Sequence, residues 1–370
     1  MSLFNENLPA LFDEQSKSGL SLSVFTDKLK QKQNLTPQEA YAAMRALMQE
    51  GISDDDKAAF LTALTQKGET EEEIAVFAYT LRQLAEKISL DEKINPVADT
   101  CGTGGGAVET FNISTAAAFL LSAADVTVAK HGNRKITSQC GSADVLEALG
   151  VNISIPPEKV KACIEETGIG FLFAPNFHKA FKNVQKVRQS LGFPTVFNIL
   201  GPLVNPAFDA SRKVNVHLLG VRAPELTERM ANVMKLLNIK KAWVVCGYNV
   251  DKTKTMDEMS ICGETKITSL NEDGEIKTFT FTPEEAGLEC AGEDELRGGT
   301  PQENAELIKN ILLGQEKSAK QKAFLLNAGA ALVVSGKTAT LPEGIANAGK
   351  ILRNGAAYAK VKQLAEFTNS

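Results

Sequence analysis

The sequence predicts an α/β protein in which a small all-helical N-terminal domain precedes a larger α/β domain with a central, mostly parallel sheet. Capped amphipathic helices fill about the first ninety residues, and from Asn95 onward short β-branched runs alternate with helical segments. The chain of 370 residues is long enough for two domains. We place the helical domain at residues 1–94, joined by helices from about 175–200, and the α/β domain at residues 95–370.

The predicted helices carry their own start and stop signals. A hydroxyl residue typical of an N-cap opens each of them: Thr36, Ser53, Thr70 and, much later, Thr300. Glu39 follows Thr36 at the spacing of a capping box. Gly51 and Gly68 predict where the first two helices end. Each helix has one apolar face, which must pack against another helix or a partner subunit.

Five apolar runs predict the strands: "PVADT", "VTVAK", "GIGFLF", "KVNVHLLGV" and "KAWVVCG". Because helical stretches separate them, we expect mostly parallel pairing. Residues 249–292 are richer in polar residues and predict hairpins. Within these runs we expect structural roles for His217 and Trp243, the latter in the core.

Composition limits the classes of function. The net charge of −5 argues against a general nucleic-acid binder, which needs a basic surface. The six cysteines form no C-x-x-C pair, which predicts a reduced, cytoplasmic protein. No uninterrupted apolar stretch approaches the roughly 18 residues of a membrane span, so we expect no membrane partner.

The segment "DTCGTGGGAVETFNIST", Asp99 to Thr115, is the first candidate binding loop. It follows a predicted strand, and its glycines let backbone N–H groups approach a ligand closely. The helix expected from about Asn112 points its positive end at the same place. The segment therefore predicts a phosphate or pyrophosphate cradle, with a tight strand-to-helix turn as the alternative.

The segment "KHGNRKITSQCGSADVLEALG", beginning at Lys130, is the second candidate. It also follows a predicted strand and supplies cations and hydroxyl groups. These residue types predict a second wall of the same anion site. The alternative is a solvated polar loop before a helix capped by Ser142.

Several long motifs, in this order, resemble the anthranilate phosphoribosyltransferase family. They are "GTGG…TFNIST", "KHGNR…TSxxGSADVLEALG", "FAPNFHKAFKNVQKVRQSLGFPTVFNILGPLVNPA", "MDEMS" and "GGTPQENAELIKNILLG". The resemblance covers nearly the whole chain beyond the first twenty or so residues. It implies a nucleoside-phosphorylase-like fold, transfer of phosphoribose from 5-phosphoribosyl 1-pyrophosphate to the amine of anthranilate in tryptophan biosynthesis, Mg²⁺, and a homodimer.

The resemblance also implies roles for individual residues. Binding of phosphoribosyl pyrophosphate falls to Gly102, Gly105, Gly106, Thr110, Asn112, Ile113, Ser114, Thr115, Lys130, His131, Gly132, Asn133, Arg134, Lys135, Ile136, Thr137, Ser138 and Ser142. Asn133 and Arg188 would hold anthranilate, and Gly102 would lie where the two substrates meet. Ser114, Asp257 and Glu258 would bind Mg²⁺ through hard oxygen ligands. No acid or base is expected; Lys130, Asn133 and Arg188 act by positioning.

Two departures and two alternatives accompany this expectation. Gly106 stands where the family usually has Asp, which leaves only a backbone amide there, and "YNVDKTK" lengthens the loop before Asp257. A pyrimidine nucleoside phosphorylase would share the fold class but would not share "KHGNR" and the acidic pair in this form. A non-catalytic nucleic-acid-binding relative would need the basic surface that the composition does not provide.

Overall fold

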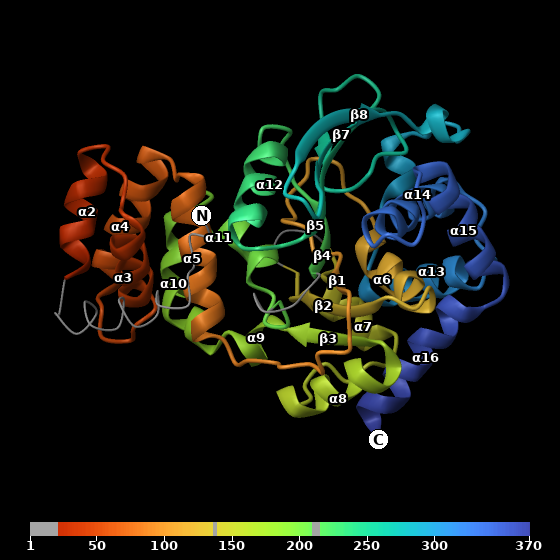
Figure 1. Cartoon of the computed structure of the whole chain (residues 1–370), viewed down its shortest axis with the longest axis horizontal. Coiled ribbons are helices and arrows are strands. Elements are labelled where there is room, and N and C mark those ends of the chain that lie inside the picture. Colours follow the sequence, from red (N-terminus) through yellow and green to blue (C-terminus); the bar gives the residue numbers. More distant parts are fainter. Residues whose placement is uncertain (1–20, 136–138, 209–214) are drawn as a thin grey trace.

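The computed structural model describes residues 21–135, 139–208 and 215–370. The predicted fold class is confirmed: a helical bundle stands beside a larger domain with a central, mostly parallel sheet (Figure 1). The strands are β1 Val97–Asp99, β2 Thr127–Gly132, β3 Ile169–Phe173, β4 Asn215–Gly220, β5 Lys241–Tyr248, β6 Thr255–Met256, β7 Thr265–Leu270 and β8 Ile276–Phe281. Their order is β3-β2-β1-β4-β5-β7-β8, with β6 paired to β5.

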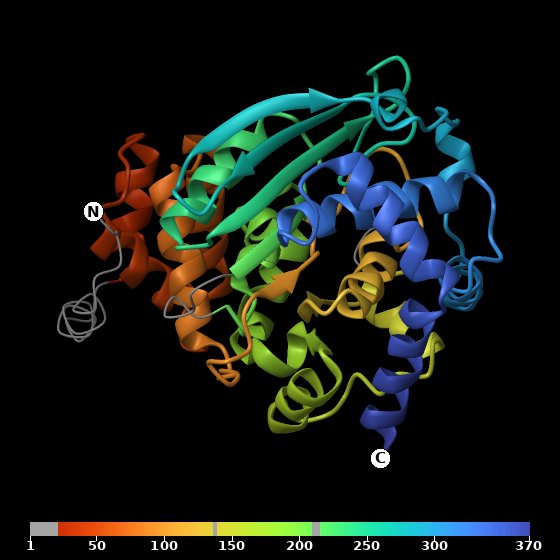
Figure 2. The same ribbon diagram turned by 45° about the vertical axis from the view of Figure 1, so that its right-hand side comes forward.

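All five predicted strands form and pair in parallel, from β3 across to β5. The polar stretch after β5 supplies the antiparallel part, in which β7 pairs with β5 and β8 covers the edge. Figure 2 shows these strands curving over the molecule. The predicted hairpin region is thus an extension of the main sheet.

The helical bundle consists of α2 Leu22–Lys30, α3 Pro37–Leu47, α4 Asp54–Lys67 and α5 Glu71–Leu84. Thr36 and Glu39 form the predicted capping box. Gly68 ends α4 with φ of +83°, a conformation that favours glycine. Gly51 was a wrong prediction for the end of α3, because the helix already stops at Leu47 and the residues that follow form a turn.

The remaining helices surround the sheet. They are α6 Ile113–Ala123, α7 Ser142–Ala148, α8 Pro157–Thr167, α9 Ala174–Phe177, α10 Lys182–Leu191, α11 Phe197–Leu200, α12 Leu226–Leu236, α13 Pro301–Leu312, α14 Ala319–Val334, α15 Leu341–Arg353 and α16 Ala356–Asn369, with short 3₁₀ turns at Lys179–Phe181, Gly201–Val204, Pro283–Ala286 and Glu293–Leu296. Helix α7 begins after Gly141, whose amide is held by Asp144, so the prediction of Ser142 as its N-cap was wrong.

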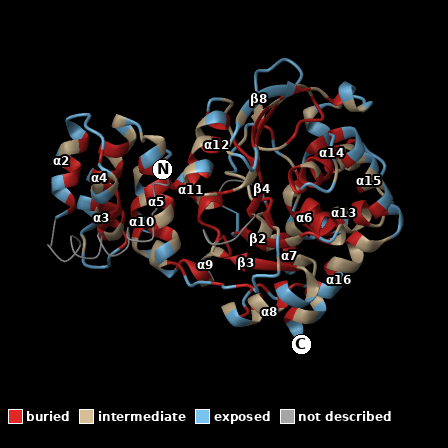
Figure 3. Ribbon diagram, viewed as in Figure 1, coloured by how far each residue is buried: buried red, intermediate tan, exposed pale blue. Residues whose placement is uncertain are grey.

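Alternation along the strands produces two cores, one on each face of the sheet. Leu219 and Val244 face the core shared with the helical bundle and α12. Leu218 and Val245 face the core built from α6 and α13–α16. Figure 3 shows buried residues concentrated in the sheet and on the helix faces toward it. The prediction of Trp243 as a core residue is confirmed only in part: it packs against the second of these cores but is half-buried, and its ring meets Phe279 edge-on, 5.8 Å between centroids.

Helix α10 belongs spatially to the bundle although it lies far along the chain. The buried Lys57 ammonium of α4 donates to the carbonyls of Gln49 and Asn183, both at 2.8 Å. The Asn183 amide donates in turn to the Met48 carbonyl at 2.8 Å. These contacts hold α10 against α4 among the helices of the bundle (Figure 1).

Candidate active site

The glycine segment leaves β1 at Asp99 and crosses the carboxyl ends of the neighbouring strands. The Thr103 N–H donates to the Gly220 carbonyl at the end of β4, 2.9 Å away. Gly104 and Gly105 have φ of +69° and +82°, which L side chains rarely adopt. A Cβ on Gly102 would lie 3.0 Å from Oδ2 of Asp257. The segment therefore needs glycine both for its conformation and for close approach.

The acidic pair follows β6 and meets this segment directly. The Gly104 N–H donates to Oδ2 of Asp257 at 2.9 Å. Burial raises the pKa of Asp257 against the opposing effect of nearby amides. Burial, and then the charge of Asp257, raise the pKa of Glu258 to about 8, while Lys130 and the Ser114 amide oppose that rise. The two buried carboxyl groups therefore resist ionisation unless more positive charge is brought beside them.

Helix α6 points its N-terminus toward the same place. Asn112 occupies the N-cap position but does not cap the helix, because its amide donates to the Cys140 carbonyl and its oxygen accepts from Asn304. Asn112 thus caps none of the first amides of α6, and that of Ser114 is directed at the Glu258 carboxylate instead, so this end of the helix already faces an anionic group. Ser114 is half-buried, and the buried Oγ1 of Thr115 has no hydrogen-bond partner within the described residues.

The second predicted wall divides into a buried part and an exposed part. Lys130 is only 4% exposed, and in the described part of the chain its ammonium has one hydrogen-bond acceptor, Thr100 Oγ1 at 3.2 Å. His131 is buried beside it, its Nδ1 3.2 Å from the Gly201 carbonyl. Gly132 also needs to be glycine, since a Cβ there would lie 2.2 Å from Ser142 Oγ.

The exposed part turns toward α7. Arg134 forms ion pairs with Asp144 and Glu147, so its charge is already neutralised. The Lys135 backbone amide donates to Asp144 at 2.9 Å, and Asn133 is exposed. The predicted residues Ile136, Thr137 and Ser138 lie outside the described residues. Thr110 and Ile113 lie at the approach to α6, where Ile113 is buried in the core.

Arg188 lies on α10, on the bundle side of the site. Its guanidinium stacks over Phe197, 4.9 Å from the ring centre, and burial lowers its pKa. No carboxylate among the described residues pairs with it. Edge-to-face ring contacts continue from Phe197 through Phe181 and His178 to His131, with centroids 5.1–5.6 Å apart. An aromatic wall therefore connects Arg188 with the Lys130 side of the site.

Three residues of this region were not predicted from the sequence as parts of the site. These residues are Asp99, Thr100 and Asn205. Asp99 accepts four hydrogen bonds at the start of the glycine segment, one of them from Asn205. The hydroxyl of Thr100 accepts a hydrogen bond from the Lys130 ammonium. An acidic residue that closes an apolar strand just before a glycine run was the available signal. His217 is structural as expected, since it is fully buried with Nε2 2.8 Å from the Cys101 carbonyl.

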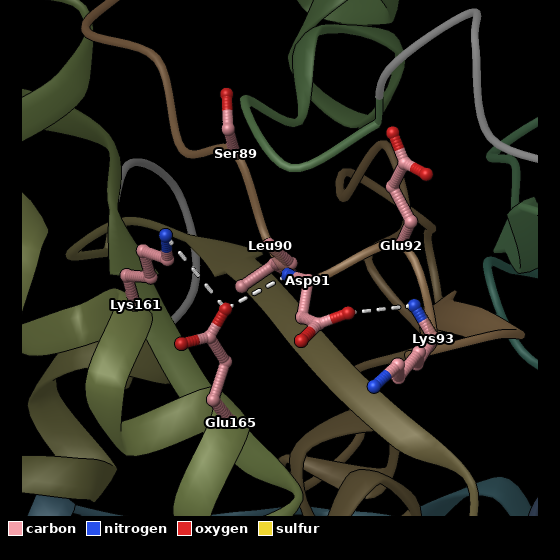
Figure 4. Close-up of a pocket in the computed structure, with 7 residues that line it drawn as sticks. All are labelled: Ser89, Leu90, Asp91, Glu92, Lys93, Lys161 and Glu165. Atoms are coloured by element: carbon pink, nitrogen blue, oxygen red, sulfur yellow. Dashed lines mark hydrogen bonds and ion pairs between the residues drawn. The ribbon is translucent and has the colours of Figure 1, made fainter.

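A separate hollow lies away from these residues. It has a volume of about 500 Å³ and is lined by Ser89, Leu90, Asp91, Glu92, Lys93, Lys161 and Glu165. Glu165 accepts from the Asp91 amide and pairs with Lys161 (Figure 4). None of the predicted site residues lines this open hollow, so we do not place the active site there.

The described part of the chain holds no group of three or more His, Cys, Asp or Glu side chains arranged to bind a metal. A metal ion would therefore need ligands from a substrate or water beside Asp257 and Glu258, as Mg²⁺ commonly takes them. Within residues 21–135, 139–208 and 215–370 no helix is both long and apolar enough to cross a membrane.

The fold and the site define a glycosyl transferase with a helical bundle and an α/β domain. The family model for the helical bundle domain matches residues 24–85, and the model for the a/b domain matches residues 94–358. An anthranilate phosphoribosyltransferase of Desulfosudis oleivorans is 46% identical over 290 residues, which cover 78% of this chain and 82% of the relative. The chain belongs to the anthranilate phosphoribosyltransferase family.

Solved structures agree with this assignment. The crystal structure of the enzyme from Thermus thermophilus has a TM-score of 0.85 and 40% identity, covering 94% of this chain and 99% of that one. The Saccharomyces cerevisiae enzyme, in complex with PRPP and Mg, has a TM-score of 0.84 and 26% identity, covering 95% and 99%.

Proposed function

We propose that this enzyme transfers the phosphoribosyl group from 5-phosphoribosyl 1-pyrophosphate to the amine of anthranilate, releasing pyrophosphate. The observation that carries the proposal is the convergence of glycine-segment amides, the buried Lys130 ammonium and the Asp257–Glu258 pair at the carboxyl ends of the parallel strands. The comparisons favour this function over a pyrimidine nucleoside phosphorylase or a non-catalytic nucleic-acid-binding relative.

The donor substrate belongs on the glycine segment and the N-terminus of α6. Backbone amides of the glycine segment and of the first turn of α6 can donate to pyrophosphate oxygens, and those of Gly104 and Ser114 would do so by leaving Asp257 and Glu258. Lys130 adds a buried positive charge, and its ammonium has one hydrogen-bond acceptor among the described residues, which leaves N–H groups for the ligand. The Ser142 hydroxyl packs against the neighbouring Gly132. Arg134 can contact the pyrophosphate only if it breaks its ion pairs with Asp144 and Glu147 on α7.

The same residues fit a magnesium ion. Asp257 and Glu258 carry raised pKa values because two carboxylates are buried together, and a divalent cation removes that penalty. The Ser114 backbone amide lies beside Glu258, and the hydroxyl of the same residue would supply a third hard oxygen ligand. When bound, Mg²⁺ neutralises charge on the departing pyrophosphate.

The acceptor belongs on the aromatic wall. Arg188 is partly desolvated, free of a carboxylate among the described residues, and able to grip the anthranilate carboxylate with both arms of its guanidinium. Asn133 can add a polar contact from the exposed side. Anthranilate is an arylamine and is neutral at pH 7, so attack on ribose C1 needs alignment more than a strong base. The C1–O bond to pyrophosphate breaks as the C1–N bond forms, and the amine loses one proton.

Gly106 and the longer loop before Asp257, which depart from the usual family pattern, each make specific contacts in the structure. A Cβ on Gly106 would lie 2.9 Å from the Cα of Met256, so this loop packs more closely on β6 than an Asp would permit. In the longer loop, Asn249 and Lys254 both bind Glu293. We expect both features to affect substrate affinity rather than the reaction itself.

Loss of anthranilate fluorescence tests the proposed function. The signal should fall only when phosphoribosyl pyrophosphate and Mg²⁺ are both present. Phosphorolysis of thymidine without that activity would favour the nucleoside phosphorylase, and retention of nucleic acid in a gel shift would favour the binding protein. The homodimer and the cytoplasmic location stay predictions; a monomer mass in light scattering at micromolar concentration would contradict the first.

A further inference from the structure

Asp99 is a buried carboxylate whose hydrogen bonds come from neutral donors. The residue is 1% exposed. Its Oδ1 accepts from the amides of Thr100 at 2.7 Å and Cys101 at 3.0 Å, and its Oδ2 accepts from Asn205 Nδ2 at 2.8 Å. Burial of a carboxylate costs several kcal/mol unless donors of this kind satisfy it. Such a group therefore persists only where its contacts are well made.

The four donors come from three separate segments. Thr100 and Cys101 begin the glycine segment, while the amide of His131, at 3.3 Å, belongs to the end of β2. Asn205 follows the 3₁₀ turn Gly201–Val204 and also donates to the Ala129 carbonyl at 2.8 Å. Asp99 thus joins the first wall of the site to the second.

Lys130 lies in the same charged cluster. Burial and then the charge of Asp99 raise the pKa of the Cys101 thiol to about 12, whereas Lys130 lowers it. Within the described chain no ion pair joins Asp99 to Lys130, whose ammonium bonds to Thr100. Lys130 and Asp99 are therefore linked through Thr100, whose hydroxyl accepts from the ammonium and whose amide donates to the carboxylate.

We propose that Asp99 is a positioning residue of the phosphoribosyl-pyrophosphate site, which fixes the glycine segment relative to the Lys130–His131 end of β2. The proposal rests on the proposed function. It assigns Asp99 no contact with substrate: the carboxylate acts through the backbone of Thr100, Cys101 and His131. Loss of the Asp99 carboxylate should weaken binding of the donor substrate. Binding of the acceptor should be unaffected, because Arg188 is positioned by α10 and Phe197.

Two variants test this. Asp99→Asn keeps the shape of the side chain but replaces one acceptor oxygen with an NH₂ group. That NH₂ group would face either Asn205 or the backbone amides, all of which are donors. Asn205→Leu keeps the carboxylate and its three backbone amides. The matched control is Thr268→Val, which removes the side-chain hydrogen bond of another fully buried residue of the same sheet, 3.0 Å from Thr268 on β7 to the exposed Thr278 on β8. Calorimetry should measure the Kd of phosphoribosyl pyrophosphate with Mg²⁺, and kinetics should give both KM values.

We expect each of the two variants to raise that Kd by about 10–100-fold, as loss of outer hydrogen-bond partners does at metal sites. The KM for anthranilate should stay within about twofold, and the control should change neither constant. Equal losses for both substrates, unchanged donor affinity in a folded variant, or failure of both variants to fold would overturn the positioning role. Failure of the wild-type protein to bind phosphoribosyl pyrophosphate would instead contradict the proposed function.

Discussion

The carboxylate of Asp257 accepts a hydrogen bond from the Gly104 amide at 2.9 Å, across 153 residues of sequence. The glycine segment and the acidic pair are therefore already in contact before any ligand is considered. A pyrophosphate oxygen that takes this amide must displace Asp257, and a cation on Asp257 makes that displacement easier. If Mg²⁺ and pyrophosphate bind as proposed, this relationship couples binding of the metal to binding of the donor substrate.

The first prediction concerns that coupling. The double variant Asp257→Asn with Glu258→Gln should lower kcat by roughly hundredfold or more, because metal-assisted departure of pyrophosphate is worth several kcal/mol in the transition state. It should also weaken the dependence of the rate on Mg²⁺. Initial rates over a Mg²⁺ titration measure both effects. A double variant that lost only anthranilate affinity would contradict the assignment.

Arg188 supports the second prediction. Arg188→Ala should raise the KM for anthranilate by roughly 10–100-fold, the equivalent of about 1.5–3 kcal/mol for hydrogen bonds to a charged group. The KM for phosphoribosyl pyrophosphate should change little. Arg188→Lys should rescue poorly, because an ammonium cannot make the paired contacts of a guanidinium.

A matched control for Arg188 stands on the same helix. Lys186 is exposed and pairs with Asp54 at 3.2 Å on the surface, so Lys186→Ala should leave both KM values unchanged. Steady-state kinetics with each substrate varied in turn make the comparison. If both variants raised the KM for anthranilate equally, general disturbance of α10 would explain the result better than a carboxylate contact.

The third prediction concerns the conformation of the glycine segment. Gly105 has φ of +82° and only the Arg222 side chain nearby, at 3.8 Å, so Gly105→Val strains the backbone without filling the core. The fold should survive while the KM for phosphoribosyl pyrophosphate rises steeply. Gly355→Val is the control, because φ there is +73° and nothing lies within 4 Å of the added Cβ. Gly355 lies in the connection between α15 and α16 and is not one of the predicted site residues. It should lower stability similarly and leave the kinetics unchanged.

Local signals in the sequence predicted most of the architecture. The capping box at Thr36 and the alternation of strands with helices are short-range patterns, and both were confirmed. The Gly51 prediction was wrong because the end of a helix depends on contacts with distant segments, and Trp243 is only partly buried because its cover depends on neighbours such as Phe279 on β8. The individual site residues stay predictions. For Asp99 the sequence offered one signal, its position at the end of an apolar strand before a glycine run, but its link to Asn205 and His131 emerges only when donors from three segments are seen together.

The last prediction concerns acid stability and His178. Burial lowers the pKa of His178 from 6.5 to about 4, against a weaker opposing contact with the Val204 backbone. The folded state therefore favours the neutral ring, so the unfolded chain binds the proton more readily below pH 6.5. The contribution of His178 to the free energy of unfolding is complete above about pH 6.5 and is lost as the pH falls toward 4.

His178→Gln removes this titration. Between pH 7.5 and 4.5 the wild-type protein should lose up to about 3 kcal/mol more stability than the variant, since each pKa unit corresponds to about 1.4 kcal/mol. Denaturant unfolding at the two pH values measures the difference. His131 and His217 also have lowered pKa values, because they are buried, so the variant should keep a smaller acid sensitivity of the same sign. Identical losses in wild type and variant would show that His178 is not protonated preferentially in the unfolded chain.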